Sequence, residues 1–89
     1  MMVCKQARYT GRVQGVGFRY TAQHLATAYR VAGYVRNLPS GDVELVAEGP
    51  AEEVDAFLAG IGHHMAGQIE QSIVQDATPG GYKGFHIRN

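Results

Sequence analysis

The sequence has a single cysteine, Cys4, among its 89 residues, so no disulfide can form within the chain. A lack of disulfides is typical of proteins from a reducing compartment. The first ten residues contain no continuous apolar run that would act as a secretion signal. The apolar stretches elsewhere are much too short to span a bilayer. We therefore expect a soluble, cytoplasmic protein that does not bind a membrane.

The sequence also lacks an excess of either charge, because eight acidic residues balance eight basic ones. Domains that bind nucleic acids usually carry a basic excess or a basic face, since contacts with phosphate groups dominate their affinity. The balance argues against a nucleic-acid partner, although it leaves room for a local positive pocket. The one close basic grouping near the start consists of Arg8, Arg12 and Arg19.

No internal repeat, low-complexity tract or linker interrupts the chain. Hydrophobic residues make up 45% of it, which is normal for a globular protein and too high for disorder. A chain of this length can bury only one modest core. We therefore expect a single domain over residues 1–89 that is a monomer and folds without a metal or a cofactor.

Hydrophobic periodicity predicts the first two elements. Apolar and polar residues alternate over residues 7–13, which indicates a half-buried strand. A loop with Gly15 and Gly17 follows. Apolar residues then recur at helical spacing over residues 18–32, which predicts an amphipathic helix that ends at Gly33.

The remaining elements begin with a hairpin, formed by strands 34–38 and 42–48 on either side of a Pro-Ser-Gly turn. Its second strand alternates cleanly, which places Glu44 and Glu48 on the solvent face. Pro50 suits the first position of the next helix, which carries the strongest amphipathic pattern of the chain. One more strand, or two shorter pieces, follows in the last third of the sequence.

This order of strand, helix, strand, strand, helix and strand determines the expected fold class. Each helix must bury its apolar stripe, and the sheet offers one face for that purpose. The pattern predicts an α+β protein, the ferredoxin-like α/β sandwich (βαββαβ), with two helices packed on one face of an antiparallel sheet.

The segment Gly11-Arg12-Val13-Gln14-Gly15-Val16-Gly17-Phe18-Arg19 joins the first strand to the first helix. Glycines there let the backbone turn sharply, and successive amides in such a turn can form a nest that binds an anion. Arg19 lies at the helix start, where a cation is unfavourable unless an anion binds nearby. The alternative is a glycine-rich connector with one surface arginine. Neither a Walker loop nor a dinucleotide-binding fingerprint is present.

A second segment runs from Gly33 to Gly49, and its candidate residue is Asn37. Asn37 shares strand parity with Val35 and lies near the end of the strand. An asparagine before Pro-Ser-Gly can also be a simple turn cap, so its chemistry alone leaves both roles open.

Together the two segments resemble the acylphosphatase family. The first signature of that family, Gly-x-Val-Gln-Gly-Val-x-Phe-Arg, is matched by Gly11 to Arg19. The second signature begins with a glycine, an aromatic residue, a small residue, a basic residue and an asparagine. Three further positions follow at fixed spacing. It is matched in type and spacing by Gly33, Tyr34, Val35, Arg36, Asn37, Gly41, Val43 and Gly49.

The resemblance implies metal-independent hydrolysis of the carboxyl–phosphate bond of a small-molecule acyl phosphate, which yields a carboxylate and inorganic phosphate. It implies that Arg19 binds the phosphate and that Asn37 orients the attacking water. It also implies a loop whose backbone amides hold the phosphate, formed by Gln14, Gly15, Val16, Gly17, Phe18 and Arg19.

Three other functions use the same order of elements. An RNA-recognition domain would carry its aromatics on a central strand, but the strand over residues 42–48 has none. The second alternative is a ligand-sensing domain without catalysis. The third is a domain that handles carbamoyl phosphate within a larger maturation protein.

Five residues with reactive side chains are predicted to take no part in the chemistry. His63 and His64 are adjacent, which is poor spacing for a metal site, so we expect both on the surface. His24 and His86 are isolated and are expected to be solvated. Cys4 has no basic partner nearby in the sequence and is interpreted as structural.

Overall fold

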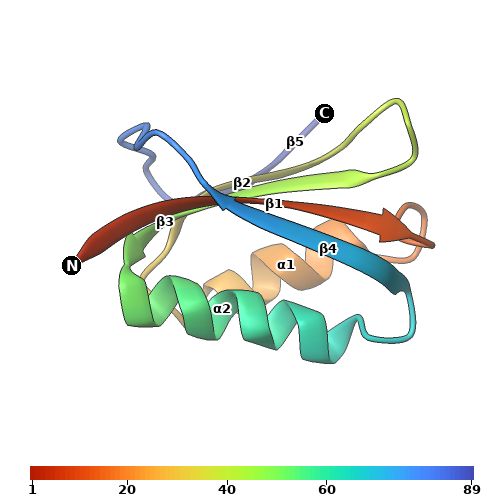
Figure 1. Ribbon diagram of the computed structural model, residues 1–89, viewed down its shortest axis with the longest axis horizontal. Helices are drawn as coiled ribbons and strands as arrows, with labels where there is room; N and C mark the ends of the chain where they lie inside the picture. The colour runs from red at the N-terminus through yellow and green to blue at the C-terminus, as the bar shows by residue number, and fades with distance from the viewer.

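Two helices cover one face of a five-stranded sheet in the computed structural model, which describes residues 1–89 (Figure 1). The predicted ferredoxin-like arrangement is confirmed. Neither helix has the length and apolar character that a membrane crossing needs. The elements in chain order are β1 (Met2–Gly11), α1 (Phe18–Ala26), β2 (Ala32–Asn37), β3 (Val43–Pro50), α2 (Ala51–His64), β4 (Ile69–Asp76) and β5 (Phe85–Arg88).

The strands lie in the order β4-β1-β3-β2-β5. β1 and β3 are central, and β1 pairs antiparallel with both β3 and β4. β2 is antiparallel to β3 but parallel to β5. The sheet is therefore mixed, because one strand pair is parallel where we expected only antiparallel pairs. The reason is that residues 77–84 carry the chain from the β4 edge to the opposite edge. The last part of the chain therefore forms two separate strands.

Helix α1 ends seven residues before the predicted stop at Gly33, and that part of the prediction was wrong. Its last residue is Ala26, and the Thr27 hydroxyl donates a 2.7 Å hydrogen bond to the carbonyl of His24. A threonine that bonds back to the preceding turn competes with helical continuation. Gly33 lies instead within β2, at φ 149°, where a Cβ would overlap the carbonyl oxygen of Val46.

The first strand is longer than predicted, since β1 begins at Met2 and pairs with β3 from there. Cys4 is consequently a buried strand residue. Burial and the nearby carboxylate of Glu48 raise the pKa of the Cys4 thiol, so it stays protonated and unreactive at neutral pH. This placement agrees with its interpretation as structural.

The core fills the space between the sheet and the two helices. Tyr9 of β1 packs against Phe18, the first residue of α1, with ring centroids 5.0 Å apart. This contact fixes the start of α1 relative to the central strands. The core consists of 14 buried residues, namely Ala7, Tyr9, Val13, Phe18, Ala22, Ala26, Val35, Val43, Leu45, Ala47, Val54, Phe57, Ile61 and Met65.

The outer sheet face carries a polar network, and Glu44 lies on this face as predicted, although neighbouring side chains cover most of its own surface. The Glu44 side chain is 12% exposed. Its carboxylate accepts hydrogen bonds from Arg36 Nε at 2.7 Å, Gln6 Nε2 at 2.8 Å and the Tyr34 hydroxyl at 3.1 Å. Glu48 likewise accepts backbone amides of the β4–β5 loop. Glu44 thereby connects β3 to β1 and β2, and Glu48 connects β3 to the β4–β5 loop.

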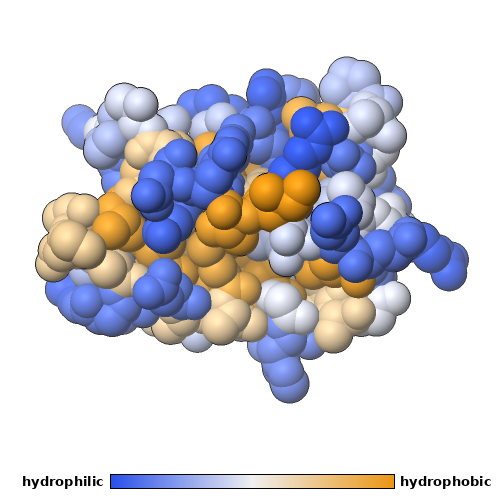
Figure 2. Space-filling model, viewed as in Figure 1, coloured by the Kyte–Doolittle hydropathy of each residue, from blue (hydrophilic) through white to orange (hydrophobic).

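Strand β4 forms one edge of the sheet and has little cover. Its side chains Ile73 and Val74 are 52% and 46% exposed. In Figure 2, apolar surface runs across the middle of the face that β4 crosses, with hydrophilic residues around it. The tight packing of the molecule therefore lies between the sheet and its helices rather than at this edge.

Tyr9→Phe is expected to reduce the loss of stability at high pH. Burial raises the pKa of Tyr9 to about 12, above its ordinary value of about 10. Because the pKa of Tyr9 is higher in the folded state than in the unfolded state, the protonated phenol contributes to stability. This stabilisation is fully present below about pH 10 and is lost as the pH rises through about 12. Two pKa units correspond to about 3 kcal/mol. The free energy of urea unfolding, measured from pH 8 to 12, should fall more steeply for the wild type than for the variant, and equal slopes would refute this.

Candidate active site

The loop between β1 and α1 turns on two glycines in the left-handed region. Gly15 has φ 75° and Gly17 has φ 80°, and Gly17 is also the N-cap of α1. A residue with a side chain is strained at such φ values, which explains why glycine occupies both positions. No side chain caps the helix, and its first turn has no acidic residue. The first amides of α1 are thus left without an intramolecular acceptor, at the positive end of the helix dipole.

Gln14 ties this loop to the β2–β3 hairpin. Its Nε2 donates to two backbone carbonyls, those of Leu38 at 2.8 Å and Asp42 at 2.9 Å. Because the amide group of Gln14 has both its donor hydrogens engaged in this way, its side chain is a structural bridge. Gln14 was predicted to lie in the phosphate-binding loop, but its bridging role was not predicted, because nothing local in the sequence indicates which carbonyls its side chain contacts.

A hollow of about 270 Å³ lies at the point where the loop and the hairpin meet. It brings together Arg19 from the start of α1 and Asn37 from the end of β2. Gln14 and Val16 do not line it, and Val16 is 40% exposed. The hollow contains no carboxylate, imidazole or thiol in its lining, which consists of Val13, Gly15, Gly17, Phe18, Arg19, Tyr20 and Asn37.

The guanidinium of Arg19 makes no ion pair, whereas three other arginines pair with carboxylates. It is partly buried at the second position of α1. A guanidinium beside a helix N-terminus and a glycine loop concentrates positive potential in the hollow. The site is therefore suited to an anion, although the charges of the whole chain cancel.

The side-chain oxygen of Asn37 is buried, and no donor of the protein bonds to it. Buried polar atoms in native proteins are nearly always hydrogen-bonded, and one that is left unpaired costs about 1–3 kcal/mol. A simple turn cap would have its oxygen occupied by a backbone amide. Asn37 instead keeps an unpaired acceptor, and the residue lines the hollow.

The other candidate reactive groups lie outside this hollow. His24, His63, His64 and His86 are all exposed, as the sequence predicts. No group of three or more His, Cys, Asp or Glu side chains is arranged to hold a metal ion. The chemistry of the hollow therefore rests on amides, one guanidinium, one carboxamide and the phenol of Tyr20.

Comparison with known proteins gives consistent matches. The family model described as Acylphosphatase matches residues 5–87. The chain is 45% identical over 82 residues to an acylphosphatase from Thermus thermophilus, with 86% of this chain and 89% of that protein covered. It is 43% identical over 81 residues to one from Methanospirillum hungatei, covering 89% of each. The crystal structure of acylphosphatase from Bacillus subtilis superposes with a TM-score of 0.88 at 30% identity and covers 100% of both chains.

Gln14→Ala is expected to lower the free energy of urea unfolding by about 1–3 kcal/mol, because two hairpin carbonyls lose their donor. Gln75→Ala is the matched control, since Gln75 makes one exposed hydrogen bond, to Gln6. That control should stay within about 0.5 kcal/mol of the wild type. Equal losses in the two variants would show that Gln14 is not the bridge.

Proposed function

The chain belongs to the acylphosphatase family and is an acylphosphatase, and from this premise we propose how its residues act. Arg19 and the backbone amides of residues 15–19 bind the phosphate of an acyl phosphate, and Asn37 orients the water that attacks it. The observation that carries the proposal is that one hollow is lined by both Arg19, whose guanidinium has no ion pair, and Asn37, whose buried Oδ1 has no hydrogen-bond donor.

Phosphate binding follows from the charge and the geometry of the loop. A planar guanidinium can donate to two phosphate oxygens at once, and Arg19 has no carboxylate to compete for it. The free amides around Gly15 and Gly17 provide donors for the remaining oxygens. These donors are in place before the substrate arrives, so they stabilise the charge that develops as the bond breaks.

Asn37 offers what a water molecule needs for orientation. Its carboxamide has an acceptor oxygen and a donor nitrogen but cannot take a proton. The oxygen accepts a hydrogen bond from the water. This bond directs a lone pair of the water oxygen toward phosphorus. A new oxygen–phosphorus bond forms, the bond from phosphorus to the acyl oxygen breaks, and its electron pair leaves with the carboxylate. A phosphate oxygen takes the proton that the water loses.

The leaving group explains why the hollow needs no general acid. A carboxylic acid has a pKa near 4, so the carboxylate leaves without being protonated. Phosphoryl transfer then demands mainly positioning and charge stabilisation. The lining fits that demand, since it has no carboxylate, imidazole or thiol and no step of the proposal requires a metal or a cofactor.

The proposal treats residues 1–89 as a single domain that works as a monomer. One continuous core supports both helices, and each residue assigned a role comes from the same chain. The binding partner is then a small molecule that carries an acyl phosphate group.

Arg19→Ala is expected to lower kcat/KM for benzoyl phosphate by about 10²–10³, because a preorganised charge contact is lost. Arg19→Lys should also be poor, since a point charge cannot replace the two-pronged guanidinium. The assay measures phosphate release in a buffer that contains a chelator. Arg12→Ala is the matched control, because Arg12 is exposed and also forms no ion pair, and it should behave like the wild type. Similar losses at both positions would point to a diffuse charge effect and contradict the proposal.

Asn37→Ala is expected to reduce kcat for the same substrate by about 10²–10³ while inorganic phosphate still inhibits at wild-type concentrations. The free energy of unfolding should stay level or rise, because the variant removes a buried oxygen that has no partner. That pairing of lost turnover with retained stability separates a catalytic role from a structural one. Near wild-type hydrolysis by Asn37→Ala would rule out the water-orienting role.

A further inference from the structure

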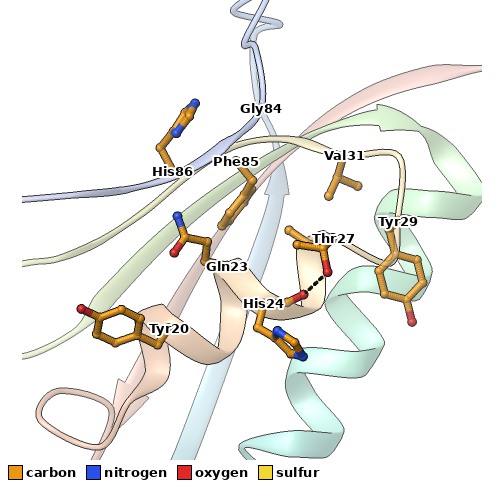
Figure 3. Close-up of a pocket in the computed structure, with 10 residues that line it drawn as sticks. Tyr20, Gln23, His24, Thr27, Tyr29, Val31, Gly84, Phe85 and His86 are labelled. Atoms are coloured by element: carbon orange, nitrogen blue, oxygen red, sulfur yellow. Dashed lines mark hydrogen bonds between the residues drawn. The ribbon is translucent and has the colours of Figure 1, made fainter.

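A second and larger hollow, of about 810 Å³, lies between α1 and β5 (Figure 3). We call it the acyl groove. One side of it is formed by Tyr20, Gln23 and Thr27, from α1 and the residue that caps it. Phe85 lines it from β5, and Val31 from the segment before β2. In Figure 3, Tyr20 lies at one end, Gln23 and Phe85 lie in the middle, and Val31 lies toward the other end.

Tyr20 connects the acyl groove to the hollow lined by Arg19 and Asn37, which we call the catalytic hollow, because it lines both. It follows Arg19 directly in α1 and is 74% exposed. Tyr20, Gln23 and Thr27 are spaced by three and four residues, so they lie along one face of the helix. At 1.5 Å per residue, this face extends roughly 10 Å from the mouth of the catalytic hollow. The groove is thus an extension of the active site along α1.

The wall of the acyl groove has a definite chemical character. Phe85 is fixed by Phe57 of α2, with ring centroids 5.3 Å apart, and presents an apolar surface. No carboxylate, lysine or arginine lines the groove. Its polar groups are an amide, hydroxyls and the imidazoles of His24 and His86. Such a wall suits an uncharged, apolar group better than a second phosphate.

We propose that the acyl groove receives the acyl group of the substrate, and that Tyr20 gives preference to bulky uncharged acyl groups. The proposal rests on the proposed function, which fixes the phosphate end of the substrate beside Arg19. The acyl carbon is then one bond away from the bridging oxygen and must leave the hollow at its rim. Tyr20 stands at that rim, so an aromatic acyl group passes its ring and enters the groove.

The test compares kcat/KM for benzoyl phosphate with kcat/KM for acetyl phosphate, whose methyl group is too small to reach the groove. Tyr20→Ala should lower the benzoyl-to-acetyl ratio by roughly 2- to 10-fold, the range expected for one aromatic contact. Tyr20→Phe keeps the ring and should restore most of the ratio. Gln23→Trp fills the middle of the groove and should lower the ratio as well. His63→Ala, an exposed ring of α2, is the control and should change neither rate.

The outcomes separate this inference from the function on which it rests. If Tyr20→Ala and Gln23→Trp reduce both substrates equally, the acyl groove has no part in substrate choice, and the inference fails alone. If Arg19→Ala leaves both rates intact, the phosphate site itself has been misplaced. Inhibition by inorganic phosphate, which has no acyl group, should be the same in Gln23→Trp as in the wild type. A large loss of that inhibition would mean that the substitution disturbs the catalytic hollow, and it would count against a separate groove.

Discussion

The two hydrogen bonds from the side chain of Gln14 to the carbonyls of Leu38 and Asp42 are the contacts on which the site depends. They join the glycine-containing β1–α1 loop to the β2–β3 hairpin. The loop ends where α1 begins, and the hairpin turn begins where Asn37 ends β2. One partly buried amide group therefore helps to bring Arg19 and Asn37, which are carried by separate elements, to one hollow. The ring contact between Tyr9 and Phe18 fixes the same helix start from the core side. The start of α1, which carries Arg19, is thus held by a polar contact through the loop and by an apolar contact with the core.

The loop, the start of α1 and the hairpin together hold two polar groups that have no hydrogen-bonding or ionic partner within the protein. The oxygen of Asn37 has no donor, and the guanidinium of Arg19 has no carboxylate. Each arrangement is unfavourable in the folded protein, because a buried unpaired oxygen and a cation at a helix start both cost free energy. A phosphate and a water would satisfy both groups at once. Strain of this kind is typical of sites in which the donors are oriented before the ligand arrives, and the rest of the fold offsets its cost.

Local pattern predicted the two-layer fold, since helical and strand periodicities show which face of each element is apolar. It failed where a single long-range contact decides the outcome. Apolar spacing over residues 18–32 could not reveal that the Thr27 hydroxyl would end α1, or that the close approach of Val46 would require glycine at position 33. The parallel pairing of β5 and the network around Glu44 depend on strand order, which alternation does not encode. The candidate site was predicted through the resemblance of two signatures. The residues alone could not decide whether Asn37 is a turn cap or a functional residue. No neighbouring residue of Gln14 in the sequence indicates that its side chain bonds to the hairpin.

The early end of α1 also shapes the proposed acyl groove. Since the helix stops at Ala26, the chain turns away over residues 27–31 and leaves space between α1 and β5. The N-terminus of this helix lines the catalytic hollow with Phe18, Arg19 and Tyr20, and its side lines the acyl groove with Tyr20 and Gln23. In the proposed reaction, the groups that act on phosphorus come from the β1–α1 loop, the start of α1 and the end of β2, whereas the groups that meet the acyl chain come from the side of α1 and an edge strand. Under this proposal, substitutions in the groove change the preferred acyl group without moving the atoms that bind phosphate, because the two hollows share only Tyr20.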